Sequence, residues 1–359
     1  MRVLHTEWSS GWGGQEMRVL QELKFLRAAG ASVFLATPPG SPLFQKAQAA
    51  GIEVLPVRFR GTIDLTSFWR VFRAIRKYRI NIVNTHSGKD TWMAGLAARL
   101  AGAVFVRTQH FLKPRRWYRS HWIYRLADHV ITTGEIVRHD VIDYCRVPPA
   151  RVTSIPSGAN HHFFDPRCFD RARARRRLGL TDSEIAVGTL SRVSMTKGLY
   201  VFLDAVEPLL RQYEGLQVYV AGDGDEFDQV KAHAGTRGIA DRVRFLGFVH
   251  EPVEYLAALD IYVLPSFKEG LPQTLLQALS MGLPAVATRV GSVEELGRDA
   301  ILLIEPGDAE VLSQALARII TNAELRQRMA SKARTTVQDR YTEECMRDHT
   351  VALYRRLMA

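Results

Sequence analysis

Cysteine is scarce in this sequence, and the three cysteines present stand far apart. Cys145, Cys168 and Cys345 lack the close spacing of metal ligands, and as an odd number they cannot all pair with one another. This argues against a disulfide framework and fits a reducing compartment. We expect them to be small buried apolar residues.

Long hydrophobic runs are also missing. No stretch approaches the ~20 apolar residues of a membrane-spanning helix, and the first residues, MRVLHTEW, enter a strand without the apolar segment of a secretory signal. With 47% hydrophobic and 24% charged residues, the composition is that of a globular protein. A chain of 359 residues is longer than a single hydrophobic core usually supports, so we expect two domains. Because neither a secretory signal nor a membrane-spanning run is found, we expect a cytoplasmic protein.

Two nucleotide-binding signatures are absent as well. The chain contains neither the G-x-G-x-x-G spacing of a dinucleotide site nor the G-x-x-x-x-G-K-[ST] sequence of a P-loop. Both the dehydrogenase and the P-loop interpretations are therefore weakened.

The excess of positive charge lies in one half of the chain. Residues 1–165 contain 23 lysines and arginines against 11 acidic residues, whereas the remainder contains 25 against 26. This asymmetry indicates an anionic partner for the first half, such as nucleic acid, a membrane or a phosphorylated glycan.

Short β-branched segments alternate with amphipathic ones along the whole chain. Twelve such segments read as buried strands, six in each half, and residues 16–29 and 199–213 read as helices between them. The strand segments are RVLHT, SVFLAT, NIVNT, VFVRTQH, HVITT and VTSIP, followed by AVGTLS, QVYVAG, VRFLGF, IYVLP, PAVAT and AILLIE. The pattern predicts an α/β protein with two parallel, doubly wound sheets.

The alternation breaks after about residue 157, where turn residues lead into a charge-rich helix. We therefore predict an N-terminal domain over 1–165 and a C-terminal domain over 166–339, with the last helix, 340–359, crossing back to the first domain. The carboxyl ends of two such sheets would face a shared crevice, so function is sought in the loops after strands.

The loop after the first strand, SSGWGGQE, is rich in small residues and opens a helix. Gly13 and Gly14 would let backbone N–H groups approach an anion at the helix N-terminus. A tight strand-to-helix connection is the alternative explanation.

Two cations five residues apart follow the first strand of the second domain, in GTLSRVSMTKG (188–198). Arg192 offers a planar fork and Lys197 a point charge, and together they suit the diphosphate of a departing nucleotide. A solvated basic loop is the alternative.

The segment SFKEGLPQTLLQALSMGLPAVAT (266–288) enters a helix after the strand IYVLP. Glu269 stands in the entry loop and can accept hydrogen bonds from sugar hydroxyls. The free N–H groups near Gln273 and Thr274 suit a phosphate, and Gln277, about one turn inside, can reach a ribose.

A basic and aromatic run covers residues 113–125. Its cations and rings, Lys113, Arg115, Arg116, Trp117 and Arg119, resemble an interfacial membrane segment or a grip for a phosphorylated acceptor. With Arg73, Arg76, Lys77 and Arg79 they favour docking on an anionic membrane surface. A solvated helix with its aromatic side chains packed inward is the alternative.

Taken in order, these segments resemble the retaining, metal-independent glycosyltransferases of family GT4, which have the GT-B fold. The similarity covers nearly the whole chain. It rests on GWGGQE (11–16), RTQH (107–110), IPSGANHHF (155–163), LSRVSMTKG (190–198), VAGDGDE (220–226), FLGFV (245–249) and the block at 266–288.

The resemblance implies roles for the matching residues. Catalytic roles fall to His110, Arg192, Lys197 and Glu269, the last on the transferred sugar. Contacts to the donor are implied for Gly13, Gly14, Gly188, Ser191, Arg192, Lys197, Gly222, Val249, Glu269, Gln273, Thr274 and Gln277. In the E-x7-E pattern of the family, Gln277 replaces the second glutamate, so we expect altered nucleotide affinity rather than lost activity.

The resemblance also implies two Rossmann-like domains facing a central cleft, no metal and no cofactor. Asp223 and Asp225 fit a strand-end turn rather than a metal site. The expected activity is retaining transfer from a nucleotide sugar, a UDP-sugar before a GDP- or ADP-sugar, to a glycan or lipid-linked acceptor in bacterial surface polysaccharide or lipopolysaccharide synthesis. The enzyme would sit peripherally on the inner face of the cytoplasmic membrane.

Two alternatives stay open. A nucleotide-sugar epimerase of GT-B shape would convert the donor without an acceptor. A non-catalytic basic protein would bind nucleic acid or membrane without needing Glu269, whereas for the glycosyltransferase we expect no nucleic acid partner.

Overall fold

The computed structural model describes residues 1–111, 122–297 and 299–359, and the chain divides into two compact units. The N-terminal unit comprises Met1–Ser157 with Glu343–Ala359, and the C-terminal unit comprises Gly158–Thr342. The boundaries thus differ from the predicted 165/166 and 339/340. Residues 158–165 belong to the C-terminal unit because the Ala159 N–H donates to the Tyr341 carbonyl and Arg334 pairs with Asp165 at 3.1 Å.

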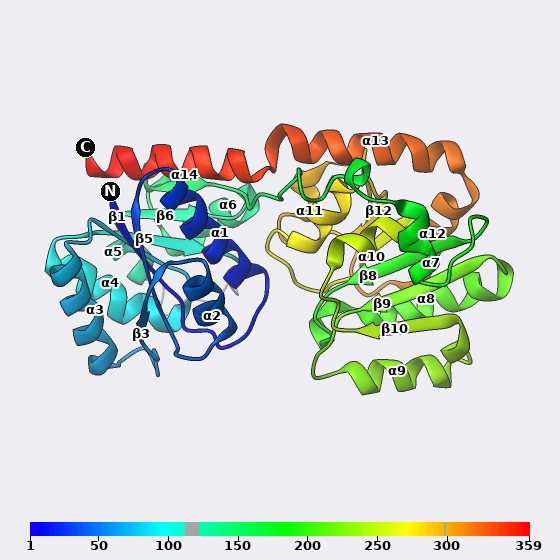
Figure 1. The fold of residues 1–359 in the computed structure, drawn as a ribbon, viewed down its shortest axis with the longest axis horizontal. Coiled ribbons are helices and arrows are strands. Elements are labelled where there is room, and N and C mark those ends of the chain that lie inside the picture. Colours follow the sequence, from blue (N-terminus) through cyan, green and yellow to red (C-terminus); the bar gives the residue numbers. More distant parts are fainter. Residues whose placement is uncertain (112–121, 298) are drawn as a thin grey trace. The chain divides into compact units, whose positions relative to one another are not determined.

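The N-terminal unit is built on a parallel sheet with the order β3-β2-β1-β4-β5-β6-β7 among its described residues (Figure 1). The strands are β1 (Arg2–Thr6), β2 (Ser32–Thr37), β3 (Glu53–Pro56), β4 (Ile82–Thr85), β5 (Val104–Gln109), β6 (His129–Thr132) and β7 (Val152–Ser154). The helices are α1 (Gly14–Ala28), α2 (Pro42–Ala49), α3 (Leu65–Tyr78), α4 (Gly88–Ala101), α5 (Trp122–Leu126), α6 (Glu135–Cys145) and α14 (Glu343–Met358).

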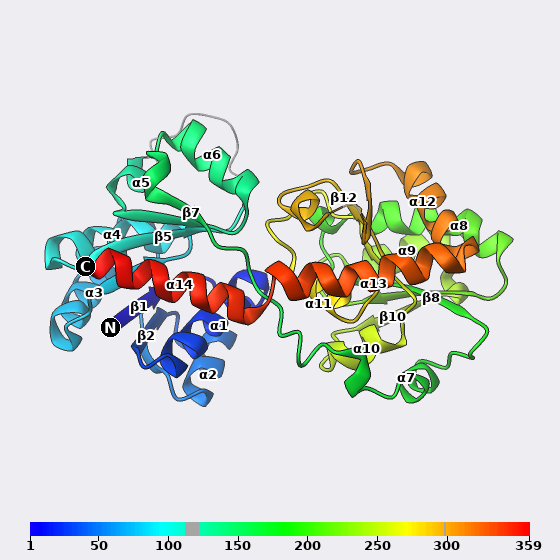
Figure 2. The ribbon, with the colours of Figure 1, turned by 90° about the horizontal axis from the view of Figure 1, so that it is seen from above.

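Both faces of this sheet are covered by helices, as its uninterrupted apolar strands require. Val3 and its neighbours pack against α1, α2 and α14, whereas Leu4 and its neighbours pack against α3, α4, α5 and α6. The C-terminal helix α14 lies along α1 (Figure 2), and the Asn84 side chain donates to the hydroxyl of its Tyr354 at 2.8 Å. The last helix therefore completes the core of the N-terminal unit.

The C-terminal unit has a second parallel sheet with the order β10-β9-β8-β11-β12-β13 among the residues the structure describes. Its strands are β8 (Ile185–Leu190), β9 (Leu216–Ala221), β10 (Val243–Gly247), β11 (Ile261–Leu264), β12 (Ala285–Thr288) and β13 (Ile301–Ile304). Its helices are α7 (Arg171–Arg177), α8 (Leu199–Gln212), α9 (Phe227–Thr236), α10 (Pro252–Ala258), α11 (Gln273–Ser280), α12 (Ala309–Thr321) and α13 (Ala323–Arg340).

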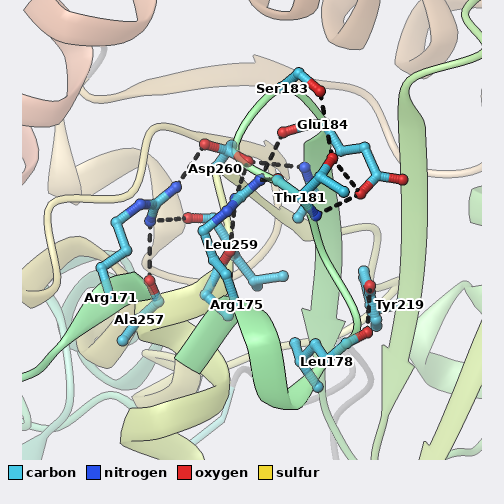
Figure 3. Close-up of polar contacts among 12 residues, drawn as sticks. Arg171, Arg175, Leu178, Thr181, Ser183, Glu184, Tyr219, Ala257, Leu259 and Asp260 are labelled. Atoms are coloured by element: carbon cyan, nitrogen blue, oxygen red, sulfur yellow. Dashed lines mark hydrogen bonds and ion pairs between the residues drawn. The ribbon is translucent and has the colours of Figure 1, made fainter. Parts of the chain in front are cut away.

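The basic helix α7 is fastened to the end of α10 by two arginines (Figure 3). Arg175 is buried and donates to the carbonyls of Ala258, Thr181 and Glu184 at 3.1, 2.6 and 2.7 Å, and it pairs with Asp260 at 2.9 Å. Arg171 donates to the other oxygen of Asp260 at 2.6 Å. This charge-rich stretch is therefore a structural anchor at the entry to the C-terminal unit.

Each sheet contains one point where the strand order reverses. In the N-terminal unit it lies between β1 and β4, and in the C-terminal unit between β8 and β11. The chain leaves neighbouring strands toward opposite faces at such a point, which opens a crevice at their carboxyl ends. Ligand-binding residues are therefore expected after β1, β4, β8 and β11.

Candidate active site

The two loops with the strongest predicted donor residues are neighbours in the C-terminal unit. β8 pairs directly with β11, although β9 and β10 lie between them in the sequence. The loop after β8 carries Arg192 and Lys197, and the loop after β11 carries Glu269. The topology thus brings these loops to the switch point of the sheet.

Lys197 and Glu269 contact each other there. The Lys197 Nζ lies 2.7 Å from the Glu269 Oε1, and the two side chains are 23% and 7% exposed. The contact uses one of three ammonium donors and one carboxylate oxygen, so both groups keep capacity for a ligand. Of the predicted catalytic residues, these two form a direct pair.

Arg192 is placed differently. Its Nη2 pairs with the Oδ2 of Asp225 at 2.8 Å, and the side chains are 62% and 80% exposed. An ion pair this exposed contributes only about 0–1 kcal/mol. The Arg192 guanidinium can therefore leave Asp225 at little energetic cost when an anion binds nearby.

Two glycines fix the path of the loop between β8 and α8. Gly222 has φ 127°, and a Cβ there would lie 1.7 Å from the Ser191 carbonyl oxygen. Gly198 has φ 66°, and a Cβ there would lie 2.0 Å from the Pro265 carbonyl oxygen. Any other residue at either position would displace this loop. The predicted donor residues Ser191 and Gly222 are therefore in backbone contact.

The first turn of α11 is held against the end of β8. The Tyr262 hydroxyl lies 3.1 Å from the Leu190 carbonyl oxygen and 2.9 Å from the Thr274 Oγ1. Gln273 is buried, and its Nε2 has no hydrogen-bond partner among the described residues. The first N–H groups of a helix lack carbonyl partners and form its positive end, so this terminus suits an anion. Gln277 follows one turn on and is half-buried.

For Gly188 and Val249, packing within the unit explains the residue without a contact to the donor. A Cβ on Gly188 would lie 2.3 Å from the Tyr255 hydroxyl oxygen and 2.8 Å from Leu259, so packing inside the unit accounts for this glycine. Val249, in the loop after β10, is half-buried and packs on the hydrophobic core.

In the N-terminal unit, Glu7 ties the glycine-rich loop to the end of β1. Its Oε1 accepts hydrogen bonds from the N–H groups of Trp8 and Ser9 at 2.9 and 3.0 Å, and its Oε2 accepts one from the Gln15 side chain at 2.5 Å. Burial, and next the charge of Asp90, raise the pKa of Glu7 to about 8. The carboxyl therefore carries its proton through much of the neutral range.

Gly13 and Gly14 begin α1. Gly13 is the N-cap residue with φ −159°, and a Cβ there would meet the Glu16 carboxylate at an ordinary 3.4 Å. Backbone strain thus does not explain the glycine at position 13. The Glu16 carboxylate lies beside Gly13 in the first turn of α1, and an anion site at this N-terminus stays a prediction.

Three histidines form a buried row across the ends of β1, β4 and β5. His5 Nδ1 lies 2.9 Å from His86 Nε2, and His86 Nδ1 lies 3.1 Å from His110 Nε2. Burial lowers the pKa of all three, that of His5 to about 3 and those of His86 and His110 well below the ordinary value. Each ring is therefore neutral at pH 7, with one N–H and one bare nitrogen.

A buried ion pair lies beside this row. Arg18 Nε donates to Glu22 Oε1 at 2.8 Å, and Arg18 Nη1 donates to Ser157 Oγ at 3.0 Å. His5, Glu22 and His86 offer ligand atoms within 4.8 Å of one another, but His5 and His86 already bond directly and the Arg18 cation would repel a metal ion. The arrangement fits a hydrogen-bonded network better than a metal centre.

The family models match both halves of the chain. The model described as "Glycosyltransferase Family 4" matches residues 12–163, and the model "Glycosyl transferases group 1" matches residues 170–336. A D-inositol 3-phosphate glycosyltransferase of Stackebrandtia nassauensis is 32% identical over 367 residues, which cover 89% of this chain and 82% of the relative. The chain belongs to the family 4 glycosyltransferases. The epimerase and the non-catalytic interpretations have no comparable support.

This glycosyltransferase also resembles a UDP-Gal:alpha-D-GlcNAc-diphosphoundecaprenol alpha-1,3-galactosyltransferase of Escherichia coli, at 25% identity over 89% of this chain and 88% of that one. The solved structure of Anabaena Alr3699/HepE in complex with UDP-glucose has a TM-score of 0.87 at 19% identity, covering 99% of this chain and 100% of that chain. The predicted GT-B fold, with two Rossmann-like domains, is confirmed.

Sequence reasoning missed two groups in the glycosyltransferase. His86 and Glu7 each follow a buried strand directly, which is the signal that could have identified them. The structure also places His5, at the end of β1, in the histidine row. The predicted acceptor or membrane residues Lys113, Arg115, Arg116, Trp117 and Arg119 lie outside the described residues.

Proposed function

We propose that this glycosyltransferase moves a sugar from a nucleotide sugar, a UDP-sugar first among the candidates, to a glycan or lipid-linked acceptor in surface polysaccharide or lipopolysaccharide synthesis, with retention of configuration. The observation that carries the proposal is the Lys197–Glu269 pair beside the N-terminus of α11. UDP-glucose in the similar Anabaena structure and UDP-Gal in the name of the Escherichia coli relative favour uridine as the base.

The cations of the C-terminal unit serve the leaving group. As the bond between the anomeric carbon and the phosphate oxygen breaks, negative charge grows on the diphosphate. Lys197, the exposed Arg192 and the N–H groups at the start of α11 stabilise this charge in the transition state, which lowers the barrier more than ground-state binding would. Glu269 accepts hydrogen bonds from the sugar hydroxyls and orients the ring.

The acceptor hydroxyl attacks the anomeric carbon from the face that the phosphate leaves. Its proton passes to the departing phosphate oxygen, so the step balances without a protein base. Glu269 is already paired with Lys197 and is not assigned that role. His110, neutral at pH 7 because burial lowers its pKa, is a hydrogen-bonding partner for the substrates rather than a cationic acid.

The enzyme is further proposed to work in the cytoplasm, on the inner face of the membrane. No helix in the described part of the chain is long and apolar enough to span a bilayer. Ile63, Leu65 and Trp69 are 85%, 66% and 53% exposed near the start of α3, and Arg70, Arg73, Arg76 and Lys77 follow them. Exposed apolar residues beside cations suit an anionic membrane surface.

A donor panel tests the proposal. UDP-, GDP- and ADP-sugars are compared for thermal stabilisation of the protein, because a ligand that binds only the folded state raises its melting temperature. One nucleotide should stabilise the protein with and without its sugar. With that donor, proton NMR should show that the sugar first transferred or released keeps the donor's anomeric configuration. No stabilisation by any nucleotide, or an inverted first product, contradicts the proposal.

A further inference from the structure

A pocket of about 440 Å³ lies at the carboxyl edge of the N-terminal sheet. Its wall includes Trp8 after β1, Lys89 and Trp92 in the first turns of α4, Arg107 near the end of β5 and Tyr124 in α5. Its volume falls within the range of about 300–1,000 Å³ that is usual for small-ligand sites. Aromatic rings and two cations meet in one concave surface that the proposed donor chemistry does not use.

Arg107 is the most unusual group in this wall. Its side chain is buried, at 3% exposure, and its Nη2 donates to the Gln109 Oε1 at 3.2 Å. Its Nε and Nη1 have no hydrogen-bond partner among the described residues. Charged donors that are buried without a hydrogen-bond acceptor are costly, so a group that accepts hydrogen bonds from this guanidinium would bind favourably.

The carboxyl of Asp90 interacts with the charge of Arg107 but accepts its hydrogen bonds from other groups. It accepts hydrogen bonds from Thr6 Oγ1 at 2.5 Å, from the His86 N–H at 3.1 Å and from the Ser87 N–H at 2.9 Å. Burial also raises the pKa of Asp90. The guanidinium of Arg107 therefore keeps unpaired donors for an external oxyanion, and arginine forms strong charge-assisted hydrogen bonds with carboxylate and phosphate.

Lys89 supplies the second charge and the tryptophans supply flat apolar surface. The Lys89 ammonium lies 3.8 Å from the centre of the Trp8 ring, on a side chain that is exposed. A cation over an exposed ring is held only weakly, so this ammonium can turn toward an anion. Trp8 and Trp92 then offer rings on which the apolar face of a sugar can stack.

We propose that this pocket binds an acidic sugar of the acceptor, one that carries a carboxylate or a phosphate on its ring, with Arg107 and Lys89 on the oxyanion and Trp8 and Trp92 on the sugar. The inference rests on the proposed function, because it names the substrate class for the acceptor side of that enzyme. It also gives the positive charge of the N-terminal half a specific use.

The test is a titration of the protein with four probes. Binding is measured by the change in tryptophan fluorescence and by calorimetry. Methyl glucuronide, glucose 6-phosphate, neutral methyl glucoside and inorganic phosphate separate the contributions of carboxylate, phosphate and ring. At least one acidic sugar should bind at least tenfold more tightly than both methyl glucoside and inorganic phosphate. Equal binding of charged and neutral sugars overturns the proposal, and so does equal binding of inorganic phosphate.

Variants locate the site. Arg107→Gln should weaken binding of the acidic sugar by more than tenfold. Because Arg107 is buried and its replacement can unfold the protein, Lys89→Ala on the exposed surface is the second variant, with an expected loss of three- to tenfold. Lys24→Ala, an exposed lysine on α1 of the same unit, is the control and should bind like the wild type. If Lys89→Ala and folded Arg107→Gln both bind the acidic sugar as tightly as the wild type, the pocket is not its binding site.

Calorimetry with UDP, GDP and ADP on the same proteins separates this inference from the proposed function. If one nucleotide binds normally and acidic sugars do not, the pocket assignment fails alone. If no nucleotide binds, the proposed function fails, and the acceptor assignment fails as well because it rests on that function.

Discussion

At the scale of single residues, burial at the strand ends of the N-terminal unit shifts protonation far from ordinary values. Glu7 holds its proton up to about pH 8, while His5, in the row with His86, stays neutral down to about pH 3. The shift of Glu7 makes stability depend on pH. The folded protein keeps a proton that the unfolded chain has lost between the ordinary pKa of 4.5 and about 8. The stability that protonated Glu7 contributes is therefore complete below pH 4.5. It is lost progressively as the pH rises from 4.5 to about 8.

Glu7→Gln should remove this pH dependence. The variant cannot release a proton, so its free energy of unfolding should rise relative to the wild type between pH 5 and 8, by up to about 1.4 kcal/mol per pH unit. Urea unfolding at pH 5, 6, 7 and 8 measures the difference. The exposed Glu53→Gln is the control. Parallel pH curves for the wild type and Glu7→Gln would show that Glu7 titrates normally.

Gly222 is the residue on which the donor loop most depends. Gly222→Ala adds a methyl group that would sit 1.7 Å from the Ser191 carbonyl, so the loop carrying Arg192 and Lys197 must move. We expect nucleotide affinity to fall more than tenfold in calorimetry. Gly238→Ala is the matched control, since its φ of 69° is also left-handed but open space surrounds it. It should lose only about 1–2 kcal/mol of stability, and equal nucleotide affinity in both variants contradicts the account.

The sequence indicated the charged donor residues but not all of their contacts. Lys197 and Glu269 were expected at one site and do meet, because each follows a buried strand and those strands are neighbours. Arg192 instead pairs with Asp225 on the surface. The histidine row could not be read from spacing, because the contact of His86 with both His5 and His110 depends on β1, β4 and β5 lying in that order.

At the scale of elements, apolar periodicity identified nearly all of the strands. The exception is β3, whose four residues end in a proline and are half-buried or exposed at the edge of the sheet. An edge strand pairs on one side only, so its sequence need not be continuously apolar. The anchoring of α7 was also beyond the sequence, because its partner Asp260 lies far along the chain.

The α7 anchor predicts a large difference between adjacent arginines. Arg175→Ala would remove the donor to the carbonyls of Ala258, Thr181 and Glu184 and one of the two arginines that bind Asp260, at a cost of about 3 kcal/mol. The neighbouring Arg176 is exposed, and Arg176→Ala should stay within about 0.5 kcal/mol of the wild type. Unfolding in urea compares the two. Similar midpoints would contradict the structural role assigned to Arg175.

At the scale of the whole molecule, positive charge and exposed apolar residues coincide on α3 of the N-terminal unit. Replacing Arg70, Arg73 and Arg76 together by Gln should lower the binding constant for vesicles of anionic lipid, measured by sedimentation, by up to about a hundredfold, because each cation near such a surface contributes about 1 kcal/mol. Binding of soluble nucleotide should not change. A triple variant of exposed cations in the C-terminal unit, Lys231, Arg328 and Lys332 to Gln, is the control. Equal sedimentation of both variants would remove α3 from the membrane contact.

The central claim is that the C-terminal unit neutralises a departing nucleoside diphosphate through Lys197. The most direct measurement is the turnover number of Lys197→Ala with the donor that stabilises the wild type most, beside Lys231→Ala as an exposed control. Loss of a preorganised charge at the leaving group should lower turnover about 10²–10³-fold, while Lys231→Ala keeps wild-type turnover. A folded Lys197→Ala enzyme that turns over at a near-normal rate would contradict the account.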